Sequence, residues 1–286
     1  MSALATPVHI RVYRIARVVV HLMRGQRIVR KRFPRLGAAE QDSEIERWSQ
    51  RLLSLLAIDV HVHEAARERP RHCMIVANHV SWLDIFVIHA QRPGVFVAKS
   101  DIRDWPLLGS LVDGVGTLFI SRGSRTHARR TNERIVQTLA SGRTVAVFPE
   151  GGTSAGDRLA HFHAALLQPA IDAEAALLPV GIRYRTPDDA RTDAANYIDD
   201  MSFLESLWRI VSQPRLTAEL HITAPLSTQG ANRRALARAS EGAIARALDL
   251  PLPHSRTETP DDLPGVPPST DHPRHSRYPD PTDQDA

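Results

Sequence analysis

Short apolar segments alternate with segments of helical periodicity along most of this chain, and that alternation limits its possible folds more than any other feature. Such a chain is expected to form an α/β domain, in which helices cover both faces of a mixed, largely parallel sheet. We therefore expect one domain over residues 39–250 of the 286. The predicted strands are 58–63, 72–77, 94–98, 117–120, 144–148, 176–182 and 216–223. The predicted helices are 39–56, 82–90, 104–112, 126–141, 160–172, 200–212 and 231–248.

The segment 1–38 is basic and amphipathic. Residues 1–35 contain nine arginine or lysine residues and no acidic residue. Residues 8–24 have the pattern of a helix, which we expect Gly25 to end. Its apolar stretch is far below the ~20 residues needed to cross a bilayer. We predict that this helix lies in the membrane interface with its arginines on lipid phosphates; a helix packed on a soluble domain is the alternative.

The segment 251–286 has the composition of a disordered tail. It contains nine of the twenty prolines and almost no large apolar residue. Such a segment buries too little apolar surface to offset the entropy lost on ordering. We predict that it is disordered.

A histidine and an aspartate lie five residues apart where a predicted strand passes into a predicted helix. His79 and Asp84 belong to the sequence NHVSWLD, residues 78–84. A carboxylate that binds one imidazole nitrogen leaves the other free to take a proton from a hydroxyl. The alternative is a helix N-cap beside an unrelated histidine. Ser81 lacks the Gly-x-Ser-x-Gly context of a nucleophile, so we assign the base to His79 and its orientation to Asp84.

Three further segments follow in a fixed order. They are residues 116–122 (GTLFISR), 148–154 (FPEGGTS) and 177–182 (LLPVGI). Together with residues 78–84 they resemble, in order and spacing, the four motif blocks of the glycerophospholipid acyltransferase family, the 1-acylglycerol-3-phosphate acyltransferases and their relatives. The resemblance covers roughly residues 70–185, and it implies the glycerol-3-phosphate acyltransferase-like fold.

The resemblance also implies the residues that bind the acceptor. Lys99 and Arg122 each end a predicted strand and are expected to bind its polar headgroup. Glu150 is expected to accept hydrogen bonds from its hydroxyl groups. Gly151 and Gly152 let backbone N–H groups approach a ligand closely. We include Thr153 in the same substrate-binding set.

The third block departs from the pattern of the family, Phe-Pro-Glu-Gly-Thr-Arg-Ser. Gly152 occupies the threonine position, and Thr153 occupies the position of an arginine that contributes to phosphate binding. Its replacement weakens the case for lysophosphatidic acid as the acceptor and makes a lyso-ornithine lipid a plausible alternative.

The resemblance implies a lysophospholipid O-acyltransferase of phospholipid biosynthesis. The expected donor is acyl-CoA or acyl-carrier protein, and the expected acceptor is the free hydroxyl of 1-acylglycerol-3-phosphate. We expect no cofactor and no metal, because transfer from a thioester to an alcohol requires neither redox chemistry nor a Lewis acid. The single cysteine, Cys73, excludes an intramolecular disulfide and suits a reducing cytoplasm. The expected location is the cytoplasmic face of the inner membrane, with peripheral or monotopic attachment to anionic lipid.

Two other classes of function compete with this interpretation. Residues 59–63 (DVHVH) have the spacing of a metal site in some hydrolases, but their alternation is also that of a half-exposed strand. A non-catalytic module that binds lipid or nucleic acid is the second alternative. We see no base-reading motif in the basic segment and therefore expect no nucleic-acid partner.

Overall fold

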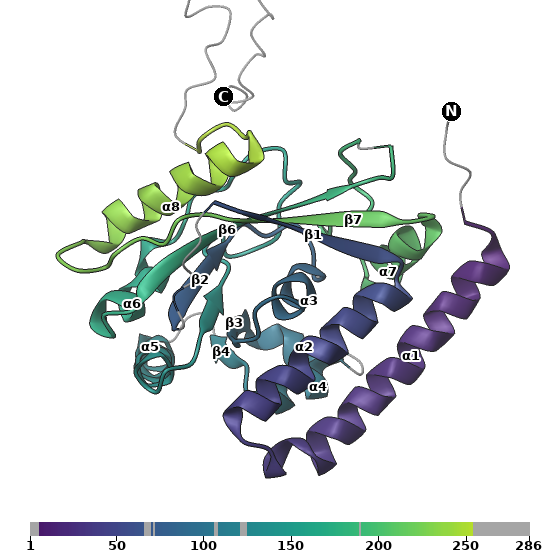
Figure 1. Ribbon diagram of the computed structural model, residues 1–286, viewed down its shortest axis with the longest axis horizontal. Helices are drawn as coiled ribbons and strands as arrows, with labels where there is room; N and C mark the ends of the chain where they lie inside the picture. Colours follow the sequence, from purple (N-terminus) through teal and green to yellow (C-terminus); the bar gives the residue numbers. More distant parts are fainter. Residues whose placement is uncertain are drawn as a thin grey trace, which may run out of the picture. The chain divides into compact units, whose positions relative to one another are not determined.

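The computed structural model describes residues 6–65, 70, 72–105, 108–120, 125–188 and 190–253, with residues 125–128 as backbone only. Over these residues the chain forms a seven-stranded sheet in the order β1-β7-β6-β2-β5-β3-β4 (Figure 1). Neighbouring strands are parallel except for the antiparallel pair β6 and β7. The predicted mixed, largely parallel sheet is confirmed.

All seven predicted strands are present in this sheet. The longest, β6, continues past its predicted end at residue 182, because it pairs with β7 from Val180 to Arg185. The strands are β1 Ile58–Glu64, β2 Cys73–Ala77, β3 Val95–Lys99, β4 Leu118–Ile120, β5 Val145–Val147, β6 Ala176–Arg185 and β7 Leu216–Ile222.

Helices cover both faces of the sheet, as predicted. One hydrophobic cluster joins α1, α2, α3, α4 and α7 to one face, and a second joins α5, α6 and α8 to the other. Figure 1 shows α1 and α2 on one side of the sheet and α8 on the opposite side. The helices are α1 Val8–Lys31, α2 Ala38–Leu55, α3 Asp84–His89, α4 Leu108–Gly114, α5 Arg125–Ala140, α6 Gln168–Asp172, α7 Phe203–Ser212 and α8 Arg233–Leu248.

Strand β2 lies in the middle of the sheet and is buried along its whole length. Cys73 and Ile75 join the cluster with α2 and α3, whereas Met74 and Val76 join the cluster with α5 and α8. This is the alternation of side chains that a strand produces. Burial raises the pKa of the Cys73 thiol, so this side chain packs as a small, neutral group.

Helix α1 does not end at Gly25, as the sequence indicated, but continues to Lys31. The reason is a close helix–helix contact, because a Cβ atom at Gly25 would lie 2.7 Å from Nε1 of Trp48 on α2. Glycine is therefore required there for packing rather than for a cap. Among the described residues, no helix combines the length and the apolar character needed to cross a bilayer. The predicted boundaries at residues 38 and 250 stay predictions.

The predicted helix 160–172 is shorter than expected. Residues 164–167 form a 3₁₀ turn, and α6 begins only at Gln168, with a proline in its first turn. Upstream, the backbone N–H of Phe162 donates to Oε1 of Glu241 on α8 at 2.7 Å. This bond to a distant carboxylate stabilises an extended conformation that the local pattern does not indicate.

Candidate active site

The turn between β2 and α3 holds the predicted histidine–aspartate pair. Nδ1 of His79 lies 2.9 Å from Oδ2 of Asp84. The same carboxylate oxygen accepts hydrogen bonds from the backbone N–H groups of Val80 and Ser81, at 2.8 and 2.9 Å. Asp84 is fully buried, so these bonds replace its hydration. The aspartate therefore fixes the turn and the imidazole together.

A tyrosine from β6 completes the surroundings of this carboxylate. The hydroxyl of Tyr184 donates to Oδ1 of Asp84 at 2.7 Å. Burial, followed by the charge of Asp84, raises the pKa of Tyr184 well above its ordinary value, so the phenol keeps its proton and acts as a donor. No local pattern in the sequence indicates Tyr184, because only the register of β6 brings it to a residue one hundred positions earlier.

The imidazole of His79 is oriented from two directions. Its ring stacks on Phe148 with centroids 3.9 Å apart and planes inclined by 9°. Its side chain is 17% exposed, and among the described residues Nε2 makes no hydrogen bond. The geometry therefore directs one nitrogen to Asp84 and leaves the other open to a substrate.

The start of the turn is held to the sheet by Asn78. Its side-chain amide donates to the carbonyl of Ile182 at 2.9 Å and accepts from the N–H of Ile182 at 2.7 Å. Ser81 is fully buried, and its hydroxyl accepts from the N–H of Leu83 at 3.3 Å. Ser81 therefore has a structural position in the turn.

Glu150 from the third block lies behind the same turn. Its Oε1 accepts from the N–H of His79 at 3.0 Å, and its Oε2 accepts from the N–H of Ala160 at 3.4 Å. Burial raises the pKa of Glu150 to about 7, and the charge of Asp84 adds to the effect. The carboxyl contacts the backbone of the turn, and Glu150 does not line the large open cavity beside His79. Its direct contact with an acceptor hydroxyl stays a prediction.

The loop after Glu150 contacts the turn and the cavity. The N–H of Ser154 donates to the carbonyl of His79 at 2.8 Å, and the hydroxyl of Thr153 donates to the carbonyl of Tyr197. Gly151 has a φ of +75°, a conformation that favours glycine. A Cβ atom at Gly152 would lie 3.8 Å from Nζ of Lys99, so the end of β3 lies close to the third block.

A large open cavity joins these groups, and we refer to it as the catalytic cavity. Its empty volume is about 1690 Å³, including the solvent at its mouth. His79, Lys99, Gly151, Gly152 and Thr153 all line it, together with His163 and the aromatic side chains of Trp82, Phe86, Trp105, Phe148 and Tyr197. Asp84 lies behind His79, and Arg122 lies outside the described residues. Among the described residues that line the cavity, Lys99 is the sole lysine or arginine.

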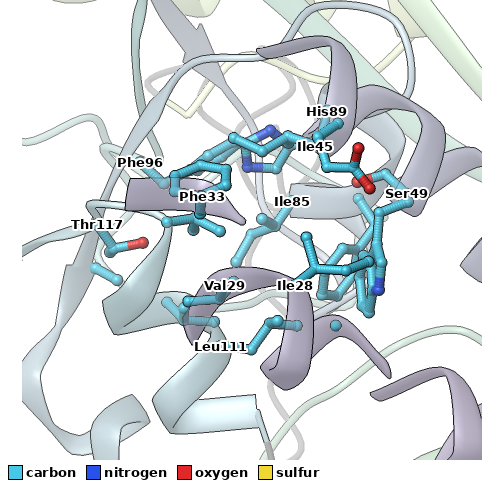
Figure 2. Close-up of a pocket in the computed structure, with 17 residues that line it drawn as sticks. Ile28, Val29, Phe33, Ile45, Ser49, Ile85, His89, Phe96, Leu111 and Thr117 are labelled. Atoms are coloured by element: carbon cyan, nitrogen blue, oxygen red, sulfur yellow. The ribbon is translucent and has the colours of Figure 1, made fainter. Parts of the chain in front are cut away.

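A second, apolar cavity lies beneath α1 and α2 (Figure 2). Its empty volume is about 610 Å³, including solvent at its opening, and it shares Ile85, Phe86, Ala98 and Val112 with the lining of the catalytic cavity. His89 from α3 also lines it, and Nδ1 of this histidine is buried without a hydrogen-bond partner among the described residues. Burial lowers the pKa of His89 to about 3, so its ring is neutral. No pattern in the sequence singled out His89.

The predicted metal-like motif at residues 59–63 contributes one histidine to a cluster on β1 and β7. The possible ligand atoms of His63, Glu219 and His221 lie within 4.8 Å of one another. Although burial opposes the change, hydrogen bonds from Arg183 and Arg185 lower the pKa of Glu219 to about 2. These two arginines already occupy Oε2 of the carboxylate. Strand β6 separates the cluster from β2, so His79 is not part of it.

Comparisons with known proteins agree with this geometry. The acyltransferase family model matches residues 57–183. The chain is 43% identical over 168 residues to the 1-acyl-sn-glycerol-3-phosphate acyltransferase of Neisseria gonorrhoeae, an alignment that covers 59% of this chain and 66% of that relative. It is 38% identical over 223 residues to the lyso-ornithine lipid O-acyltransferase of Pseudomonas aeruginosa, covering 77% of this chain and 84% of the relative.

A solved structure shows the same fold. The 1-acyl-sn-glycerophosphate acyltransferase of Thermotoga maritima superposes with a TM-score of 0.59 at 23% identity, over 82% of this chain and 96% of that chain. At this identity the likeness concerns the arrangement of helices and strands. The sequence relatives show that the chain belongs to the acyltransferase family that includes the 1-acylglycerol-3-phosphate and lyso-ornithine lipid acyltransferases.

Proposed function

We propose that this protein transfers a fatty acyl group from acyl-CoA or acyl-carrier protein to the free hydroxyl of a lysophospholipid, 1-acylglycerol-3-phosphate. One observation carries the proposal: the imidazole of His79, held by Asp84 at 2.9 Å, lines a large open cavity. The membership of the family supports the class of reaction.

The proposed reaction needs one base. As the acceptor oxygen attacks the thioester carbon, its O–H bond breaks and the proton moves to Nε2 of His79. The tetrahedral intermediate then loses the thiolate as the C–S bond breaks, and the imidazolium returns the proton to sulfur. Asp84 stabilises the imidazolium and keeps Nδ1 oriented. No step requires a metal or a bound cofactor, so the proposed reaction includes neither.

The two cavities suggest where each part of the substrates binds. The aromatic and polar lining of the catalytic cavity suits the thioester of the donor and the headgroup of the acceptor. Lys99 provides a cation for a phosphate there. The adjoining apolar cavity suits an alkyl chain, because its lining is almost entirely hydrocarbon (Figure 2). The four shared side chains make the two regions neighbours.

A lyso-ornithine lipid is the alternative acceptor. The observation that favours it is Thr153, whose hydroxyl bonds the Tyr197 carbonyl where the family pattern has a phosphate-binding arginine. An acceptor without a phosphate would need fewer cations than lysophosphatidic acid. Lys99 alone among the described lining residues provides such a charge.

An acceptor panel tests both versions. Purified full-length protein receives one labelled acyl-CoA and, separately, lysophosphatidic acid, lyso-ornithine lipid and lysophosphatidylcholine, all dispersed in detergent. We expect product with lysophosphatidic acid and none from His79→Ala. Product with lyso-ornithine lipid alone would identify that lipid as the acceptor. The absence of product with every acceptor, from acyl-CoA and from acyl-carrier protein alike, would contradict the proposal.

We also propose that the protein attaches peripherally to the cytoplasmic face of the inner membrane through anionic lipid. The names of the relatives are those of enzymes that acylate lipids, and α1 exposes Val8, Val12 and Tyr13. Exposed apolar side chains beside arginines are typical of helices that lie in a membrane interface.

A further inference from the structure

Helix α1 lacks, over most of its length, the polar outer face expected for a helix on the surface of a soluble domain. Its buried residues include Val18, Leu22 and Gly25, which pack toward α2, α4 and the sheet. Its solvent-exposed residues before Arg24 are apolar apart from His9. At 3.6 residues per turn they share one face of the helix, about 24 Å long. These exposed apolar residues are Val8, Val12, Tyr13, Ala16, Val20 and Met23.

The remaining exposed residues of the same face are basic. Arg24, Arg27, Arg30 and Lys31 occupy the last two turns of α1. A face that is apolar along most of its length and cationic at one end complements a lipid bilayer, which offers hydrocarbon beneath anionic phosphates.

Helix α7 adds a second apolar surface beside α1. Leu204 is 73% exposed and Trp208 is 39% exposed, although each belongs to a type of side chain that is usually buried. The guanidinium of Arg11 on α1 lies 5.3 Å from the ring centre of Trp208, so the two surfaces are adjacent. Arg14 strengthens the junction by donating to the carbonyls of Gln213 and Pro214, at 2.7 and 3.0 Å.

The inner side of α7 borders the catalytic cavity. Phe203, next to Leu204, packs against Trp82 and Trp105 with ring centres 5.0 and 5.6 Å away. Trp82 also donates from Nε1 to the hydroxyl of Ser206 at 3.0 Å. Both tryptophans line the cavity. One short helix therefore separates the exposed apolar side chains from the site where an acceptor would bind.

We propose that Leu204 and Trp208 of α7 enter the bilayer together with the apolar face of α1, and that this two-helix face turns the catalytic cavity toward the lipid. The proposal rests on the proposed function, since it names the surface through which a lipid acceptor reaches that site. The occupant is a bilayer that contains anionic lipid. The basic end of α1 lies against its phosphates, and α7 lies against its hydrocarbon.

The test compares vesicle binding with turnover. Full-length Leu204→Gln/Trp208→Gln is co-sedimented with vesicles of phosphatidylethanolamine and phosphatidylglycerol, and Leu252→Gln serves as the control. Leu252 is also an exposed leucine, but it lies after α8, the helix that covers the opposite face of the sheet. Glutamine adds no charge, so a loss reports apolar contact rather than repulsion. We expect at least about a tenfold loss of partitioning for the α7 variant, and none for the control.

Turnover of a detergent-dispersed acceptor is measured on the same samples. We expect it to stay within about twofold of the unmodified protein, so that failure of the docking idea and failure of the proposed reaction are distinguishable. An α7 variant that binds vesicles as well as the control would overturn the proposal, whatever its turnover.

A second measurement does not depend on affinity. Brominated or spin-labelled lipid quenches the fluorescence of tryptophan that enters a bilayer, and the chain has four tryptophans. We expect most of the quenching to disappear in Trp208→Phe. Equal quenching in this variant and in the unmodified protein would show that Trp208 stays in water and would overturn the proposal.

Discussion

Two histidines at opposite ends of α3 show how surroundings decide what one side chain can do. His79 precedes the helix, binds Asp84 and opens onto the catalytic cavity. His89 ends the helix and lines the apolar cavity (Figure 2), and its Nδ1 has no hydrogen-bond partner within the described part of the chain. One imidazole has a carboxylate partner at hydrogen-bonding distance, and the other is held neutral by burial. The proposed role of His79 as the base therefore depends on the carboxylate and not on the histidine alone.

The largest effect is expected from removing the paired histidine. His79→Ala should lower turnover by about 10²–10⁴-fold, because the acceptor hydroxyl loses its base. Steady-state kinetics on the preferred acceptor measures this effect. His61→Ala, an exposed histidine of β1, is the matched control and should keep full turnover. Similar losses in both variants would remove the distinction between His79 and other histidines.

The buried carboxyl behind the turn should give the strongest dependence on pH. Because burial raises the pKa of Glu150 to about 7 from an ordinary 4.5, the folded protein keeps a proton that the unfolded chain releases. The free energy of unfolding should therefore fall as pH rises from 4.5 through 7, by the order of 3 kcal/mol.

Glu150→Gln isolates this titration, since an amide cannot lose the proton. We expect the variant to match the unmodified protein at pH 4 and to exceed it in stability at pH 8. Denaturant unfolding over this range measures the difference. Parallel pH profiles for the two proteins would show that Glu150 ionises normally in the fold.

The tyrosine that supports Asp84 should have a smaller effect. Tyr184→Phe removes one hydrogen bond to a buried carboxylate and should lower the free energy of unfolding by about 1.5–3 kcal/mol. Turnover should fall less than in His79→Ala, because three donors to Asp84 remain. Chemical denaturation and kinetics measure both, with the exposed Tyr13→Phe as a control. An unchanged stability would contradict the role of Tyr184 in holding the carboxylate.

The smallest effect is expected from the unpaired histidine, and its sign is opposite. His89→Leu replaces an imidazole, whose buried Nδ1 has no partner among the described residues, with a hydrocarbon side chain of similar size. The free energy of unfolding at pH 7 should rise by about 1 kcal/mol. Thermal or denaturant unfolding measures the change. A clear loss of stability would mean that a bound water or ligand satisfies the ring in solution, and the contrast with His79 would then need a different explanation.

Local signals in the sequence sufficed for most of the fold and for the centre of the site. The apolar runs located the strands, and the five-residue spacing of His79 and Asp84 predicted a contact made within one turn. Tyr184 and Phe148 were not predicted as partners, because the sheet brings them to the turn from distant segments. The predicted end of α1 at Gly25 was wrong for a related reason, since this glycine is required by the close contact with Trp48 on another helix.

The two arginines at the start of α1 have a consequence for the order of assembly. Arg11 and Arg14 reach Trp208 and the carbonyls that follow α7, which lie roughly two hundred residues later in the chain. During synthesis the first helix leaves the ribosome long before these partners exist. The complete proposed membrane surface can therefore form only after the segments between these partners have been synthesised. Full attachment through this surface would then follow the synthesis of the residues that form the catalytic cavity.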